Sequence, residues 1–353
     1  MEKKIIITGG GTAGHIMPNL ALLPELQKEF DKIYYFGSSN SMEERILKDY
    51  KQVEFVAIPT TKLVRKFTLK NLAIPFKLIK SICTTKKKIK QLKPDVIFCK
   101  GGFVSVPVAI AGKMCKIPVV SHESDYSMGL ANKIILKFAN TVCTTFEDTA
   151  LVSKKCVCTG TPIREQVFKG KKENITQKFD YDKNKPCALF FGGSLGSKNI
   201  NNLVKNSLPI LTEKFNVLHI TGKNNAFKTS AKNYYQVEFT NRIEDFFACS
   251  DIVVCRGGAN SLFELLALEK PMLIIPLSKA ESRGDQLENA EYFKKHNWAE
   301  VLLEENMSTK TLIDKLDYIN KNQSKYKNSH SLSKTNANRK IVDIIKNSAI
   351  GGS

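Results

Sequence analysis

The chain is poor in acidic residues and has no long apolar run. Its 353 residues include 34 Asp and Glu against 54 Lys and Arg, which gives a formal net charge of +20. The longest apolar stretches, such as 104–112, are far shorter than the roughly 18–20 residues that span a bilayer. The sequence therefore does not predict an integral membrane protein, and its 42% hydrophobic content is that of an ordinary globular one.

Paired cysteine motifs and a secretory leader are also lacking. The nine cysteines are odd in number and scattered among apolar runs, so we expect reduced core residues. Cys156 and Cys158 stand too close together for a Cys-x-x-Cys pair, and no second pair exists, so a zinc site is not expected. The N-terminus runs straight into a glycine cluster without the apolar segment of a signal peptide, so we expect the chain to stay in the cytoplasm.

The positive charge is concentrated between residues 51 and 100, which hold 13 Lys and Arg against two Asp and Glu. Lysines there surround apolar residues at helical spacing, as in a basic amphipathic helix: Leu72, Phe76, Ile79, Ile82 and Cys83. Three interpretations stay open. In the first, the apolar residues belong to the core and the lysines face solvent. In the second, the helix binds anionic lipid. In the third, it binds nucleic acid, although the sequence contains no recognisable nucleic-acid-binding motif.

Short apolar segments alternate with amphipathic helical patterns, which is typical of parallel sheets covered by helices. In the first half the predicted strands are 4–8, 32–36, 53–58, 96–99, 118–121 and 141–144. A turn at 160–162 ends this half, and strands resume at 187–191, 217–221, 252–255 and 272–276. We therefore predict an α/β protein with two Rossmann-like, doubly wound parallel-sheet domains, whose ligands bind at the carboxyl ends of the strands.

Glycine-rich loops follow four of the predicted strands, at 9–14, 100–105, 192–197 and 256–261. The first satisfies G-x-G-x-x-G, but the second strand ends in Phe-Gly-Ser-Ser, without the acidic residue that binds a ribose in dinucleotide sites. We therefore reject NAD and FAD and expect no cofactor. Turns of this kind let backbone N–H groups approach a diphosphate or a sugar.

Seven sequence blocks, in order along nearly the whole chain, carry a resemblance to a known family. They are 10–15 (Gly-Gly-Thr-Ala-Gly-His), 101–105, 122–123 with 129–132, 160–164, 192–194, 256–259, and 285–286 with 289–290. The chain resembles the MurG family of peptidoglycan N-acetylglucosaminyltransferases. The resemblance implies a GT-B fold in which two Rossmann-like domains face a central cleft. Residues 1–162 would face the acceptor and the membrane, 163–333 would bind UDP-GlcNAc, and a helix within 334–353 would return to the first domain.

The activity implied by the resemblance is a metal-independent, inverting transfer. N-acetylglucosamine would move from UDP-GlcNAc to the C4 hydroxyl of MurNAc in undecaprenyl-diphospho-MurNAc-pentapeptide (lipid I), giving lipid II for peptidoglycan. The implied partners are these two substrates and the anionic inner membrane surface, with a peripheral location on the cytoplasmic face of the plasma membrane and no nucleic acid. Two alternatives stay open: another nucleotide-sugar enzyme of this fold, such as a glycolipid glucosyltransferase or a UDP-GlcNAc 2-epimerase, and a non-catalytic basic binding protein.

An inverting transfer needs a base for the acceptor hydroxyl and stabilisation of the departing diphosphate. His15 closes the first glycine turn, titrates near neutral pH and matches the family's base. His122 is the competing candidate, which we interpret mainly as a hydrogen-bonded packing residue. The motif Asp180-Tyr181-Asp182 has the D-x-D pattern of a manganese site, but it lies among lysines away from a strand end, so we expect a solvated turn.

Substrate-binding residues are expected in both halves. Ser194 precedes a helix expected from Lys198, whose N-terminus favours anions, and the carboxylate of Glu264 can accept hydrogen bonds from both ribose hydroxyls. The resemblance implies that Arg164 binds phosphate, that Ile243 contacts uracil through its backbone and that Gln286, or its neighbour Asp285, binds the sugar. The other implied substrate-binding residues are Thr12, Ala13, Gly14, Asp125, Ala259, Asn260 and Ser261.

Two further expectations concern the first domain. Asp125 stands where many family members have asparagine, and a carboxylate cannot donate a hydrogen bond as an amide does. The resemblance favours the interpretation that the lysine-rich segment faces lipid, because lipid I carries a polyprenyl tail. The residues expected to form this patch are Arg65, Lys66, Phe76, Lys77, Ile79 and Lys80.

Overall fold

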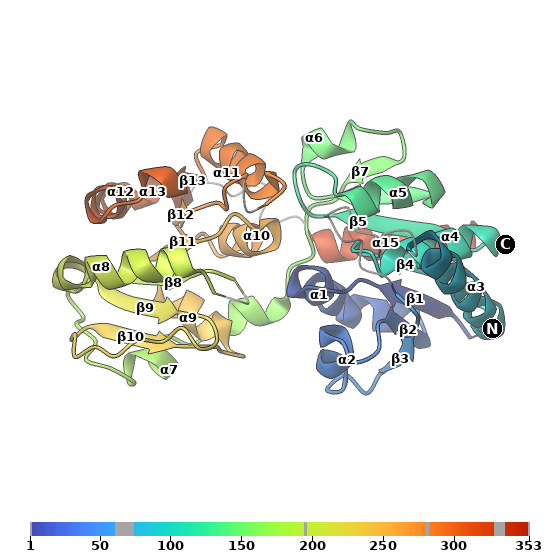
Figure 1. Cartoon of the computed structure of the whole chain (residues 1–353), viewed down its shortest axis with the longest axis horizontal. Helices are drawn as coiled ribbons and strands as arrows, with labels where there is room; N and C mark the ends of the chain where they lie inside the picture. The colour runs from blue at the N-terminus through green and yellow to red at the C-terminus, as the bar shows by residue number, and fades with distance from the viewer. Residues whose placement is uncertain (1, 61–73, 194–195, 280–281, 328–335, 352–353) are drawn as a thin grey trace. The chain divides into compact units, whose positions relative to one another are not determined.

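A computed structural model describes residues 2–60, 74–193, 196–279, 282–327 and 336–351. The chain forms two compact units, and each is built on one parallel sheet (Figure 1). The N-terminal domain comprises Met1–Arg164 with Asn336–Ser353, and the C-terminal domain comprises Glu165–Thr335. The structural boundary thus lies between Arg164 and Glu165, where the sequence had placed it between 162 and 163.

The sheet of the N-terminal domain has seven parallel strands in the order β3-β2-β1-β4-β5-β6-β7. Their bounds are β1 (Lys4–Thr8), β2 (Lys32–Gly37), β3 (Val53–Ala57), β4 (Val96–Cys99), β5 (Val119–Glu123), β6 (Thr141–Thr144) and β7 (Cys156–Cys158). The central strands are almost wholly buried, since helices cover both faces of a parallel sheet. This order places the carboxyl ends of β1, β4 and β5 side by side.

Helices pack on both faces of this sheet. They are α1 (Ala13–Glu29), α2 (Met42–Leu47), α3 (Ile74–Leu92), α4 (Ser105–Met114), α5 (Leu130–Phe138), α6 (Glu147–Ala150) and α15 (Ala337–Ile350). Successive strand residues point to opposite faces, so Ile5 and Ile7 pack with α1 and α15 in one core cluster. Ile6 packs with α3, α4 and α5 in the other.

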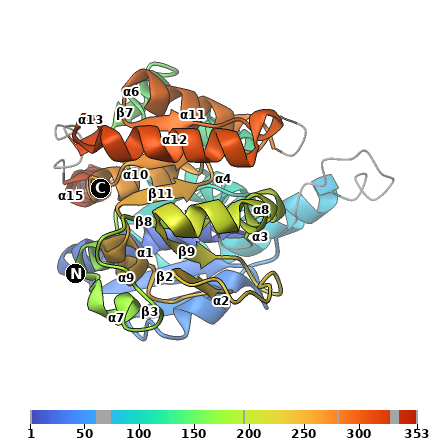
Figure 2. The same cartoon turned by 90° about the vertical axis from the view of Figure 1, so that its left-hand side faces the viewer.

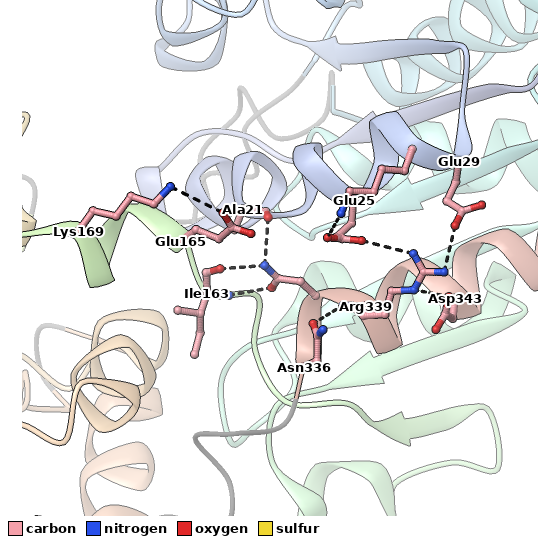
Figure 3. Close-up of polar contacts among 11 residues, drawn as sticks. Ala21, Glu25, Glu29, Ile163, Glu165, Lys169, Asn336, Arg339 and Asp343 are labelled. Atoms are coloured by element: carbon pink, nitrogen blue, oxygen red, sulfur yellow. Dashed lines mark hydrogen bonds and ion pairs between the residues drawn. The ribbon is translucent and has the colours of Figure 1, made fainter.

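The last helix, α15, belongs to the N-terminal domain although it comes after the whole C-terminal domain. Ile341, Val342 and Ile345 bury its apolar face in the core beside α1. Arg339 binds Glu29 at 3.1 Å and Glu25 at 3.4 Å, both on α1 (Figure 3). The amide of Asn338 donates to Ile163 O at 2.9 Å and to Ala21 O at 3.1 Å and accepts from Ile163 N at 3.0 Å. The Asn338 side chain therefore joins α15, α1 and the end of the first chain segment.

The C-terminal domain has a six-stranded parallel sheet in the order β10-β9-β8-β11-β12-β13. The strands are β8 (Cys187–Phe191), β9 (Asn216–Ile220), β10 (Tyr234–Val237), β11 (Ile252–Cys255), β12 (Met272–Ile274) and β13 (Ala299–Val301). Its helices are α7 (Glu173–Thr176), α8 (Lys198–Lys214), α9 (Ile243–Cys249), α10 (Ala259–Ala267), α11 (Asp285–Lys295), α12 (Thr309–Lys321) and α13 (Gln323–Lys327), with short 3-10 helices η2 (Glu165–Lys169) and η3 (Glu304–Asn306). On one face, α8 and α12 cover Ala188 and Phe190 in a continuous apolar core.

The prediction of two doubly wound parallel sheets is confirmed, and the ten predicted strands are present with small shifts at their ends. The sequence missed β7, β10 and β13. All three are edge strands of three or four residues, and they are only partly buried, so they lack the apolar run of a central strand. The first helix, α1, begins at Ala13 and contains Pro18 and Pro24.

The structure also bears on the expected burial of the cysteines and on the expected absence of a membrane span. Five of the nine cysteines are buried, but Cys83 is exposed, so the expectation that all are core residues is wrong for that one. Within the described ranges, no helix is both long and apolar enough to cross a membrane.

We predict that Asn338→Ala loosens α15. The change removes three hydrogen bonds at a half-buried position, which should cost about 1–3 kcal/mol and speed hydrogen–deuterium exchange of the α15 amides roughly 5- to 150-fold. Asn347→Ala, an exposed position on the same helix, is the matched control. Equal exchange rates in the two variants would contradict this role of Asn338.

Candidate functional site

In the N-terminal domain the first glycine turn is held by a buried acid that the sequence did not point out. Glu43 on α2 is 1% exposed, and its carboxylate accepts from Ser38 N at 3.2 Å and Gly11 N at 3.4 Å. A Cβ atom on Gly10 would lie 2.6 Å from Glu43 Oε1, so a side chain at this position would displace the carboxylate. A dinucleotide site would carry an acid at the end of the second strand. Glu43 instead lies on the helix that follows and binds the backbone of the loops after β1 and β2.

His15 lies in the first turn of α1 and is half-buried. Its Nδ1 is 3.0 Å from Thr12 Oγ1, so the hydroxyl of this N-cap residue contacts the imidazole rather than the helix backbone. Gly102 approaches from the loop after β4. It has a φ of +77°, and a Cβ there would lie 2.8 Å from Gly10 O and 3.5 Å from His15 Nδ1. The structure thus brings the first two glycine loops together around His15.

His122, the competing base, has a different environment. It is fully buried at the end of β5, and its Nε2 donates to Gly160 O at 2.9 Å. Burial, followed by the nearby charge of Lys100, holds the pKa of His122 well below its usual value. The ring therefore stays neutral and faces the interior of the domain.

The loop after β5 is organised by Glu123, which is also buried. Its Oε1 accepts from Asp125 N at 3.0 Å, and its Oε2 accepts from Gly129 N and from Asn132 Nδ2, both at 2.9 Å. These bonds fix the backbone of the loop at Asp125 and at Gly129, and Asp125 is half-buried. Arg164 is half-buried at the last position before the C-terminal domain, next to Ile163, which Asn338 holds.

In the C-terminal domain a cavity of about 400 Å³ opens at the carboxyl ends of β8, β11 and β12. Its polar lining combines glycine backbone with six side chains, from Ser197, Lys198, Asn199, Arg256, Ser261 and Gln286. Gly193 and Gly196 adopt φ values of +83° and +75°, and α8 begins at Lys198, as predicted. Ser194, the predicted phosphate-binding residue, lies outside the described residues. A helix N-terminus together with Lys198 and Arg256 makes this cavity suited to an anion.

Arg256 holds the glycine loop beside this cavity. It is buried, and its Nη2 donates to Ser197 Oγ at 2.6 Å while Nη1 donates to Ile275 O at 3.1 Å. Nη1 also lies 2.7 Å from Glu304 Oε1, which accepts from Asn199 Nδ2 at 2.8 Å. Burial raises the pKa of Glu304, but the hydrogen bonds from Asn199 and Arg256 outweigh it, so the pKa lies below its usual value. The ion pair therefore connects the start of α8 to η3.

Asp285 and Gln286, the first two residues of α11, have different environments. Asp285 pairs with Arg283 at 3.1 Å, whereas Gln286 lines the cavity. Gln286 Oε1 accepts from Gly257 N and Leu277 N, both at 3.2 Å, which fixes the orientation of the amide. Ser261 also lines the cavity. Other expected residues of this domain are outside the lining. Ala259, Asn260 and Glu264 lie on α10 with Ser261, and Ile243 is the first residue of α9.

The D-x-D motif at 180–182 makes contacts within its own turn. Asp182 Oδ1 accepts from Asn184 N at 2.9 Å within a turn, and Asp182 pairs with Lys185 at 3.9 Å. Within the part of the chain that the structure describes, no three His, Cys, Asp or Glu side chains are grouped to hold a metal ion.

Two parallel-sheet domains with glycine turns at the carboxyl edge of each sheet are the architecture of GT-B glycosyltransferases. A solved structure of Acinetobacter baumannii MurG superposes with a TM-score of 0.75 at 25% identity, covering 98% of this chain and 99% of that one. The UDP-GlcNAc 2-epimerase of Neisseria meningitidis, at 15% identity and a TM-score of 0.68, covers 97% and 99% and shares the fold alone.

Sequence comparison then specifies the family. The chain belongs to glycosyltransferase family 28, since residues 5–144 match its N-terminal domain and residues 187–346 its C-terminal domain. It is 46% identical to the UDP-N-acetylglucosamine--N-acetylmuramyl-(pentapeptide) pyrophosphoryl-undecaprenol N-acetylglucosamine transferase of Clostridium tetani, over 98% of both chains. The transferase 2 of that name in Bacillus cereus is 43% identical, over 98% of this chain and 99% of its own.

We predict that Glu304→Gln destabilises the C-terminal domain by about 2–3 kcal/mol near neutral pH, because it removes the charge opposite the buried Arg256. The pKa of Glu304 is lowered on folding, so its contribution is complete above about pH 4.5 and is lost as the pH falls through the lower folded-state pKa. The difference from the wild type, measured by urea unfolding, should therefore shrink in acid.

The matched control is Asp317→Asn, in the more exposed pair with Lys214, whose side chains are 33% and 42% exposed. This change should cost less than about 1 kcal/mol. A cost for Glu304→Gln no greater than that of the control would contradict the structural role of the Arg256–Glu304 pair.

Proposed function

We propose that this protein transfers N-acetylglucosamine from UDP-GlcNAc to the C4 hydroxyl of MurNAc in lipid I and so produces lipid II for peptidoglycan. The observation that carries the proposal is the 46–47% identity, over 98% of the chain, to transferases named for this reaction. The likeness to the 2-epimerase extends to the fold alone, so it gives the rival activity no comparable support.

In the proposed mechanism His15 is the base. When its Nδ1–H donates to Thr12 Oγ1, the lone pair on Nε2 is left to take the proton of the acceptor hydroxyl. The hydroxyl oxygen then attacks the anomeric carbon as the bond to the diphosphate breaks, and UDP leaves with the bonding electron pair. Thr12, Ala13 and Gly14 supply the turn and the helix N-terminus beside this reaction.

The cavity of the C-terminal domain is the proposed donor site. The N-terminus of α8, Lys198 and the loop held by Arg256 would stabilise the negative charge that builds on the diphosphate, with Ser194 and Arg164 as further predicted phosphate contacts. Gln286 would donate to the sugar hydroxyls. The remaining predicted contacts are Glu264 with the ribose, Ile243 with uracil, and Ala259, Asn260 and Ser261 at the start of α10.

The decisive assay is transfer of radiolabelled N-acetylglucosamine from UDP-GlcNAc to a short-chain lipid I analogue, with EDTA present and UDP-glucose as competitor. Transfer that survives EDTA and is not competed by UDP-glucose is the expected result. Consumption of UDP-GlcNAc without transfer would contradict the proposed function and favour an epimerase or another nucleotide-sugar enzyme.

We predict that His15→Ala lowers kcat about 10²- to 10⁴-fold, the usual contribution of a general base, and leaves the KM for UDP-GlcNAc within about twofold. His296→Ala, at an exposed position after α11, should keep wild-type turnover. Turnover of the His15 variant equal to that of the control would remove His15 as the base.

A lipid-facing surface on α3 is the second part of the proposal. Phe76 and Ile79 are 76% and 58% exposed, with Lys77 and Lys80 exposed beside them, while Ser81 and Ile89 face the core. The interpretation that the whole apolar stripe is core is therefore wrong for Phe76 and Ile79. Figure 2 shows the first turns of α3 standing clear of the other helices of its domain. Arg65 and Lys66, also expected in this patch, lie outside the described residues.

The position of this surface fits a lipid-linked acceptor. α3 precedes β4 and therefore begins at the carboxyl edge of the sheet, where His15 lies. Helix α5 also begins at this edge, and its first residue, Leu130, is 56% exposed. Apolar side chains that enter the interface, surrounded by lysines that attract anionic headgroups, would hold the protein at the membrane surface.

We predict that Lys77→Ala with Lys80→Ala weakens sedimentation with anionic liposomes about 30-fold, at roughly 1 kcal/mol per lysine. The control is Lys87→Ala with Lys90→Ala on the same helix. These lysines lie about 15 Å further along it, beyond the screening length of roughly 8 Å at physiological salt, and should matter little. Equal losses for both pairs, or no preference of the wild type for anionic lipid, would contradict the surface.

A further inference from the structure

Lys100 is a buried lysine at the functional edge of the N-terminal domain, and neither the proposed mechanism nor the proposed binding sites use it. It follows β4, the strand between β1 and β5, and its backbone N–H donates to Thr8 O at 2.8 Å. The side chain is 2% exposed, and Nζ donates to Ser124 Oγ at 2.5 Å. Lys100 therefore connects the strand that leads to His15 with the loop that carries Asp125.

The stem of Lys100 packs directly against the first glycine turn. A Cβ atom on Gly9 would lie 2.9 Å from Lys100 Cβ. The two residues after Lys100 are Gly101 and Gly102, with φ values of +96° and +77°, and Gly102 is the residue that approaches the imidazole of His15. The position of Lys100 is thus tied to both loops that surround His15.

A buried ammonium group requires negative charge nearby. Burial lowers the pKa of Lys100 to about 8, and the charges of Glu123 and Asp125 act against this lowering. Glu123 is held by three hydrogen bonds, two from the backbone of the loop that follows, at Asp125 and Gly129, and one from Asn132 on α5. The ammonium, held by Ser124, therefore lies in the field of two carboxylates, one at the end of β5 and one in the loop that follows, and Asp125 is the more exposed of the two.

We propose that Lys100 is a positioning residue of the acceptor site, whose ammonium fixes Ser124 and offsets the charge of Asp125. Asp125 then stands as a carboxylate that accepts hydrogen bonds from donors on the acceptor sugar, in a place that must also receive an acceptor with a charged diphosphate. Without the ammonium, the uncompensated carboxylate repels that acceptor. The inference rests on the proposed function, because it concerns binding of the acceptor and not of the nucleotide sugar.

A double-mutant cycle tests this coupling. Lys100→Met keeps an unbranched apolar side chain, one atom shorter, and removes the charge, and Asp125→Asn removes the opposing charge. With a short-chain lipid I analogue, Lys100→Met should raise the acceptor KM about tenfold or more and leave the KM for UDP-GlcNAc within about twofold. Asp125→Asn alone should raise the acceptor KM only about threefold. Adding Asp125→Asn to Lys100→Met should improve the acceptor KM, because no uncompensated carboxylate remains.

Independent, multiplicative effects of the two substitutions would overturn the inference, as would a fall in kcat with no change in the acceptor KM. Ser124→Ala tests the same contact if Lys100→Met does not fold: an acceptor KM about threefold higher supports the proposal, and an unchanged one overturns it. Lys32→Met, exposed at the opposite edge of the sheet, is the matched control. A wild-type protein that transfers no sugar refutes the proposed function and the inference together, whereas an active wild type with multiplicative variants refutes the inference alone.

Discussion

Glycine turns at the ends of parallel strands have no side chains of their own to hold them in place, and both domains depend on buried charged side chains that do so. In the N-terminal domain, the carboxylate of Glu43 accepts backbone N–H groups from two loops, and Glu123 does the same for the loop around Asp125. In the C-terminal domain, Arg256 binds Ser197 at the start of α8 and is balanced by Glu304. Each of these charges is satisfied by hydrogen bonds, as burial requires.

The buried charged side chains have different surroundings in the two domains. The carboxylates of the N-terminal domain accept hydrogen bonds from backbone N–H groups, and the charges of Glu123 and Asp125 oppose the effect of burial on the pKa of Lys100. The cation of the C-terminal domain stands beside a cavity whose lining includes Lys198 and a helix N-terminus, an arrangement that favours an anionic ligand. In the proposed function, one domain would supply the base, His15, and the other would supply the pocket for the diphosphate.

Much of this architecture could be predicted because it depends on local patterns. Buried strands such as Cys187–Phe191 are continuous apolar runs, and glycine loops after strands indicate the functional edge. Edge strands such as β7 and β13 were missed since three half-buried residues carry no periodic signal. The roles of Glu43, Lys100 and Glu304 could not be predicted either. Each depends on a partner distant in the sequence or on a burial that only the folded chain reveals.

Hydrogen–deuterium exchange with UDP alone tests the central claim, that the nucleotide is held by the cavity of the C-terminal domain while the edge around His15 serves the acceptor. The account predicts that UDP slows exchange in residues 196–199 and 256–261 and leaves 122–129 unchanged, and that a lipid I analogue then protects 9–15 and 122–129. Protection by UDP that is strongest in the loops of the N-terminal domain would contradict it.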